Sequence, residues 1–187
     1  MLLEESHQAE AAGEYWCQLL HEHRGEEELD ARRTLFVRWP RLGTANRLHA
    51  VASGAWPPQE ADVLVALAAR PDDYIEFPLE TLHNVPLAWT EAHRLDLART
   101  ELWDRLIAAY QVHDPVAVLP VLESIVEAGL IVAEVRNYKM AVARLRKHRA
   151  IAAVAGRPEA TAGLVASLRE RNRNRPRLLR ELDRVKF

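Results

Sequence analysis

Apolar residues recur at steps of three and four along much of this chain of 187 residues. The clearest run is Leu102, Trp103, Leu106, Ile107 and Tyr110. Such spacing gathers apolar side chains on one face of an α-helix, which can then be buried. Glycine is scarce, with 7 in the whole sequence, and no β-branched run typical of a strand interrupts the pattern. The sequence therefore predicts an all-α fold.

Proline marks where several of the predicted helices begin or end. Asp114 and Pro115 form a strong start signal. An aspartate can accept hydrogen bonds from the first N–H groups of a helix, and a proline in the first turn has no N–H to leave unsatisfied. Pro71 is expected to end a helix over 59–70 and to begin a less regular stretch over 71–78.

The predicted helices of the second half fall into antiparallel pairs. The pairs join residues 86–95 with 98–112, 114–134 with 136–155, and 157–173 with 176–185. Within the second pair, Leu145 should pack against Leu122 or Val126. Three further helices, over 2–24, 27–38 and 41–53, are expected in the less regular first 55 residues. Helix pairs that repeat after about forty residues are typical of an α-solenoid. We therefore predict one helical domain over 1–187, in which residues 59–187 form a short tetratricopeptide-like solenoid.

Several phrases of the second half match a known helical region. They are Leu87-Ala-Trp-Thr-Glu-Ala-His, His113-Asp-Pro-Val-Ala-Val-Leu-Pro-Val-Leu-Glu, Arg136-Asn-Tyr-Lys-Met-Ala-Val-Ala-Arg-Leu-Arg, Gly156-Arg-Pro-Glu and Arg175-Pro-Arg-Leu-Leu-Arg-Glu-Leu-Asp. Through these phrases, residues 87–185 resemble the C-terminal helical region of bacterial proteins that carry a SWIM zinc finger. The resemblance implies tetratricopeptide-like repeats, which usually serve as protein-binding scaffolds.

The zinc finger of that family is missing from this sequence. Its metal motif needs a Cys-x-Cys pair followed by Cys-x-His, because zinc takes four nitrogen or sulfur ligands in its structural sites. Cys17 is the one cysteine of the chain and cannot supply that motif. The zinc-dependent or DNA-directed role that the finger implies is therefore not carried over. The chain would be a stand-alone relative or a fragment without the finger.

Charge is distributed unevenly along the chain. Residues 136–187 contain 15 Lys and Arg against 4 Asp and Glu, a net charge of +11. Residues 1–135 contain 10 against 23, a net charge of −13. One interpretation is a basic surface for nucleic acid or an acidic partner. The other is that the basic helices pack near the acidic part or have solvated faces. The candidate residues of a basic surface are Arg144, Lys147, Arg169, Arg171, Arg173 and Arg175.

Few residues suggest catalysis or metal binding. Cys17 and His21 lie four residues apart on a predicted helix, but two ligands do not make a metal site. Glu80 and His83 have the Glu-x-x-His spacing of a di-iron helix, which requires a second such pair that this chain lacks. There is no Gly-x-Ser-x-Gly motif and no glycine-rich phosphate loop. His148 is interpreted as a hydrogen-bonded packing residue. We expect no catalytic residue, metal or cofactor.

The sequence favours a non-catalytic helical-repeat module that binds another protein or a peptide. The alternative is a protein associated with nucleic acid through its basic C-terminal third, and a third hypothesis is a metal-dependent helical enzyme. Only Tyr138 and Phe187 are aromatic in residues 136–187, whereas proteins that bind single strands usually place stacking rings beside the charges. One cysteine allows no internal disulfide, and no apolar stretch is long enough to span a membrane. We expect a cytoplasmic protein.

Overall fold

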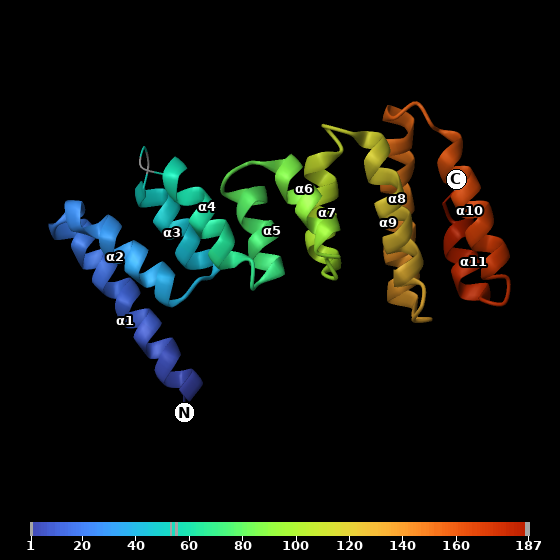
Figure 1. The fold of residues 1–187 in the computed structure, drawn as a ribbon. Helices are drawn as coiled ribbons and strands as arrows, with labels where there is room; N and C mark the ends of the chain where they lie inside the picture. The colour runs from blue at the N-terminus through green and yellow to red at the C-terminus, as the bar shows by residue number, and fades with distance from the viewer. Residues whose placement is uncertain (1, 53, 55, 186–187) are drawn as a thin grey trace. The chain divides into compact units, whose positions relative to one another are not determined.

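The computed structural model describes residues 2–52, 54 and 56–185, and only the backbone of residues 2–5. Within these residues the chain forms eleven α-helices and no strand. Figure 1 shows the course of these helices. The helices are α1 (Leu2–His23), α2 (Gly25–Arg38), α3 (Leu42–Ala52), α4 (Pro57–Leu67), α5 (Pro71–Glu80), α6 (Val85–Arg94), α7 (Thr100–Tyr110), α8 (Pro115–Gly129), α9 (Val135–Val154), α10 (Glu159–Arg171) and α11 (Pro176–Asp183). The predicted all-α fold is confirmed. Residue 53, which ends one predicted helix, and Phe187 lie outside the described residues.

Backbone contacts divide the chain between Leu102 and Trp103, within α7, into two compact units. Unit 1 comprises the described residues up to Leu102, and unit 2 those from Trp103 onward. A core of unit 1 contains Phe36, Ala45, Leu48, Ala52, Trp56, Val63, Leu67 and Phe77. A core of unit 2 contains Val126, Leu130, Tyr138, Ala141, Val142, Leu145, Leu164, Val165, Leu168, Leu178 and Leu182. No helix of the described chain combines the length and apolar character needed to cross a membrane.

Helix α9 is the central element of unit 2. It packs against α8, and the short turn at 130–134 makes these two helices the antiparallel pair that the sequence predicts. Figure 1 shows them side by side. Helices α10 and α11 also pack against α9. Leu145 is fully buried in the core that contains Val126, as predicted.

The ends of the α8–α9 pair follow from local chemistry. Asp114 Oδ1 accepts hydrogen bonds from the N–H groups of Val116 and Ala117, each at 2.9 Å, and Pro115 is the first residue of α8. Helix α9 ends just before Gly156, whose φ of 69° lies in the left-handed region that glycine adopts without steric cost. The predicted start signal at residue 114 is therefore confirmed.

The segment after Pro71 differs from the prediction, because it is helical. Helix α5 begins at Pro71, and both Asp72 and Asp73 lie in its first turn. A proline suits the first turn because its φ is already helical, and acidic side chains near the N-terminus are stabilised by the helix dipole. Helix α5 then packs against α6. The predicted irregular stretch over 71–78 is wrong: the proline starts a new helix as well as ending the one before.

Candidate functional site

Two of the predicted basic residues, Arg144 and Lys147, lie on α9 beside the part of α7 that belongs to unit 2. The guanidinium of Arg144 donates hydrogen bonds to both carboxylate oxygens of Asp104, at 2.7 and 3.3 Å. Lys147 Nζ donates to the backbone carbonyl of Asp104 at 3.3 Å. Burial lowers the pKa of the Lys147 ammonium group. Both side chains therefore help to hold α9 against α7.

Two of the four predicted arginines of 169–175 form ion pairs with acidic residues close to the C-terminus. Arg169 of α10 pairs with Asp183 of α11, with 2.7 Å between nitrogen and oxygen. Arg173 pairs with Glu170, three residues before it, at 3.5 Å. The Arg173 pair is exposed on both sides and contributes little to stability, whereas the Arg169 pair joins two helices.

The other two arginines, Arg171 and Arg175, come together at the end of α8. Arg171 donates a hydrogen bond of 2.5 Å to Glu127, and this bond holds the pKa of the Glu127 carboxyl group below its usual range. Arg175 donates to the backbone carbonyl of Leu130, which has no partner within α8. Both arginines thus bind groups at the C-terminal end of α8, where the helix dipole favours cations.

A different set of cations is free on the surface of unit 2. Arg136, Lys139 and Arg146 are exposed on α9, and none forms an ion pair or hydrogen bond within the described part of the chain. With about 100° between successive residues, the three lie within an arc of roughly 80° on one side of the helix. Helix α9 itself contains no acidic residue. None of these three cations is among the residues predicted to form a basic surface, although their helical spacing was a usable signal.

An apolar groove lies at the C-terminal end of the same helix. Its volume is about 430 Å³, and it is lined by Gln111, Val112, Pro115, Ala150, Ile151 and Val154. Val112 and Val154 are 83% and 79% exposed. Ala150 lies one turn after Arg146, so the groove adjoins the exposed face of α9. Gln111 is the one polar residue among those that line the groove, which therefore offers no acid, base or nucleophile.

A buried hydroxyl group, a buried imidazole and a partly exposed carboxylate link three helices of unit 2. His148 of α9 is fully buried, with Nδ1 2.8 Å from the Thr161 hydroxyl oxygen and Nε2 3.1 Å from Glu123 Oε1. An ionised carboxylate can only accept, so Nε2–H donates to Glu123, whereas the Thr161 hydroxyl group can donate to Nδ1 or accept from it. The order of groups is that of a catalytic triad. However, Thr161 is 1% exposed, and its hydroxyl group is out of reach of a substrate. His148 is therefore the hydrogen-bonded packing residue that the sequence predicts.

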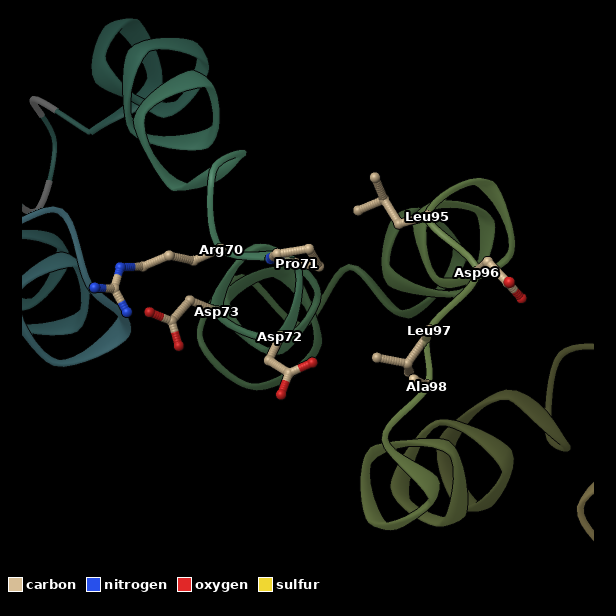
Figure 2. A pocket seen from close by; sticks show the side chains of 8 residues that line it. All are labelled: Arg70, Pro71, Asp72, Asp73, Leu95, Asp96, Leu97 and Ala98. Carbon is tan, nitrogen blue, oxygen red and sulfur yellow. The ribbon is translucent and has the colours of Figure 1, made fainter.

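Unit 1 contains a cavity of about 500 Å³ between α5 and the turn after α6 (Figure 2). The cavity is lined by Arg70, Pro71, Asp72, Asp73, Leu95, Asp96, Leu97 and Ala98. Figure 2 shows Leu95 and Leu97 pointing toward α5, while Asp96 points away from the other lining side chains. The three carboxylates do not converge on one point, as metal binding or paired acid–base catalysis requires.

The acidic residues of this cavity have structural roles. Asp73 Oδ2 accepts a hydrogen bond of 3.2 Å from the N–H of Leu42, at the start of α3. Asp72 pairs with Arg99 at 3.6 Å. Asp96 has a φ of 49° just after α6, a left-handed position at a helix end that aspartate tolerates better than most residues. These contacts give the three aspartates a structural role at the places where helices and turns meet around the cavity.

A cluster of charged residues lies between α1, α2 and α3 of unit 1. Arg32 donates to Glu14 at 2.5 Å and to Glu28 at 3.1 Å, and Arg47 donates to the second oxygen of Glu14 at 2.5 Å. Glu28 is buried, and its other oxygen lies 2.7 Å from His21 Nδ1. A buried carboxylate needs such partners, because leaving it unpaired is strongly destabilising. The cluster is a fully paired network.

The sequence pairs considered for metal binding do not form sites. Cys17 is buried, and burial raises the pKa of its thiol, whereas His21 is exposed and directed to Glu28. Glu80 is the last residue of α5, and His83 lies beyond the helix with a φ of 52°. Among the described residues, no group of three or more His, Cys, Asp or Glu side chains is arranged to hold a metal ion.

Comparisons with known proteins identify neither a family nor a fold neighbour for this chain. No protein-family model matches the chain, and neither the curated protein sequences nor the solved structures provide a match.

Proposed function

We propose that this chain is a non-catalytic helical interaction module that binds another protein or a peptide. The observation that carries the proposal is the apolar groove of unit 2, at which Val112 and Val154 are almost fully exposed. Isolated exposed valines are common on protein surfaces, but a groove with apolar walls offers a place for a partner's side chain. The groove contains no group that could carry out a reaction.

Two further considerations support a scaffold. Among the described residues, no group of three or more His, Cys, Asp or Glu side chains is arranged to hold a metal ion, and the Thr161 hydroxyl group beside His148 is buried. The resemblance of residues 87–185 to the helical region of SWIM proteins favours a tetratricopeptide-like arrangement, in which helix pairs stack as a short solenoid. We include that arrangement in the proposal, with α8 and α9 as one of its pairs.

The proposal is tested by capturing partners from host lysate with three forms of the purified chain. These are the wild type, a groove variant with Val112→Ser and Val154→Ser, and a control with Val65→Ser and Val132→Ser. The control valines are 76% and 55% exposed and line neither the groove nor the other pockets described, and each variant has one substitution in a helix and one in a turn.

The expected result is a protein retained by the wild type and the control and lost by the groove variant, as quantified by mass spectrometry. A set of captured proteins that is identical for all three forms would contradict a binding role for the groove. Circular dichroism of the three forms shows whether each variant keeps its helices.

A second candidate function is association with nucleic acid. It is favoured by one observation, namely that Arg136, Lys139 and Arg146 have no partner within the described chain. Three phosphate contacts would make the logarithm of the binding constant for duplex DNA fall with the logarithm of salt concentration, with a slope of about −2.7. Fluorescence anisotropy with labelled duplex and single-stranded probes measures this slope. If this alternative holds, replacing the three cations with glutamine should abolish the salt-dependent binding.

A further inference from the structure

We infer that the exposed face of α9 and the adjoining groove form one docking surface for an acidic protein segment with an apolar anchor residue. The inference rests on the proposed function and names the chemistry of the partner. It combines two features of unit 2, the unpaired cations Arg136, Lys139 and Arg146 and the apolar groove at Val112 and Val154.

No acidic side chain of the described residues neutralises the positive charge of this face. Most arginines of the C-terminal region that sequence reasoning singled out have an acidic or carbonyl partner in unit 2, as with Arg144 and Asp104. Arg136, Lys139 and Arg146 have none within the described residues. Helix α9 contains no acidic residue, and the nearest one in sequence is its N-cap residue, Glu134. The complement of three unpaired cations on one helix face is a run of carboxylates.

The middle of the face lets a partner approach closely. Ala143 and Ala150 lie between and beyond the cations on the same side of α9, and both are exposed. Met140 is 39% exposed on this side, and its flexible thioether can adapt to an apolar contact. The short side chains of Ala143 and Ala150 therefore leave room for a partner's backbone between the cations and the groove.

Distances along the helix set the length of the segment. With about 1.5 Å of rise per residue, Arg136 and Arg146 lie roughly 15 Å apart, and Val154 lies roughly 12 Å farther on. An extended chain advances about 3.3 Å per residue. The matching segment therefore has about five residues with acidic side chains, followed about four residues later by an apolar side chain.

The apolar end of the surface distinguishes this partner from nucleic acid. A nucleic acid presents phosphates and bases, and protein surfaces that bind single strands place aromatic rings beside the cations. Tyr138 is the one aromatic residue of α9, and it is buried in the core of unit 2. The groove at Val112 and Val154 instead fits an aliphatic side chain.

Fluorescein-labelled synthetic peptides of twelve residues test the inference by anisotropy with the full chain. One peptide carries five glutamates, a glycine–serine spacer and two leucines, and a second has the reverse order. Matched peptides replace the glutamates with lysine or serine, or the leucines with serine. We expect saturable binding for a peptide with both glutamate and leucine, and binding at least about tenfold weaker when either is replaced. Binding should weaken as salt is raised, because exposed charge pairs are screened.

Two triple variants locate the surface. Arg136→Gln, Lys139→Gln and Arg146→Gln should weaken binding about tenfold, since each exposed pair contributes modestly. The control changes Arg70, Arg177 and Arg180 to glutamine, which alters the net charge equally at exposed positions outside α9 and should change binding less than about twofold. Equal loss in both variants, or tight binding by the lysine peptides, would overturn the inference.

The results also separate this inference from the function on which it rests. If the serine-for-glutamate peptide binds as well as the acidic one and is lost only in the Val112 and Val154 variant, the groove binds peptides but the acidic partner is wrong. If no peptide binds and no host protein depends on the groove, both are wrong. If duplex DNA binds more tightly than every peptide and is lost in the α9 triple variant, nucleic acid is the ligand and both are overturned.

Discussion

Replacing Leu145 with alanine tests whether α9 is the central helix of unit 2. Leu145 is fully buried in a core to which α8, α10 and α11 also contribute, for example through Val126, Leu168 and Leu182. The substitution removes three buried carbon atoms, which lowers the free energy of unfolding by about 2.4 kcal/mol at about 0.8 kcal/mol each. A cavity that the neighbours do not refill adds up to about 2 kcal/mol. We expect a loss of about 2–4 kcal/mol.

The measurement is urea denaturation followed by far-ultraviolet circular dichroism, with Met140→Ala as the control. Met140 lies on the same helix but on its exposed side, so its replacement should change the free energy of unfolding by less than about 0.5 kcal/mol. Tryptophan fluorescence gives a second signal. Four of the five tryptophans lie within residues 1–102, so fluorescence reports mainly on unit 1 and helicity on both units.

Two results of the urea denaturation would contradict the expected loss. If Leu145→Ala loses less than about 0.5 kcal/mol, or no more than Met140→Ala, then α9 does not bury this face against its neighbours, and the assignment of the helix pairs in unit 2 is wrong. A loss above about 5 kcal/mol would indicate that the core rearranges beyond one cavity.

Three other properties follow from named contacts. Asp114→Ala removes the acceptor for two N–H groups at the start of α8 and should cost about 1 kcal/mol in urea denaturation, against no change for Ser124→Ala on the exposed side of that helix. The Cys17 thiol is buried with a raised pKa, so Ellman's reagent should modify it much more slowly in the native protein than in denaturant; equal rates would show an open site. The pKa of Glu127 is lowered by Arg171, so its contribution to stability is present above the ordinary value of 4.5 and is lost as pH falls through the lower folded value. Glu127→Gln should flatten the acid side of the denaturation profile, and an unchanged profile would contradict this pairing.

The sequence was a good guide to where helices form and a weaker guide to what proline does between them. Helices such as α7 and α9 were predictable because apolar residues recur on one face. Helix α5 was missed because Pro71 was taken only as the end of a helix. Proline serves equally well in a first turn, and the two aspartates after it were the evidence for a new start.

The candidate site was less predictable, because an ion pair depends on which helices pack together. Arg171 and Glu127 are 44 residues apart in sequence, and Arg144 and Asp104 are 40 apart. Counting charges cannot show that such residues meet, since the packing of α9 and α10 on their neighbours brings them together. The spacing of Arg136 on its helix was visible in the sequence, but its lack of a partner was not.

The pairing of charges changes what the basic C-terminal third implies. A net charge of +11 over residues 136–187 suggests a long positive surface. In the structure, acidic residues of α7 and α8, such as Asp104 and Glu127, neutralise part of it from outside that region. Of the arginines that alternate after residue 168, Arg169, Arg171 and Arg175 connect to a neighbouring helix or its end, whereas Arg173 forms a local pair with Glu170. The cations of α9 that have no partner in the described chain, Arg136, Lys139 and Arg146, lie on one side of the helix, which an apolar groove adjoins. A surface of that size and composition suits a brief segment of another protein better than the continuous backbone of a nucleic acid.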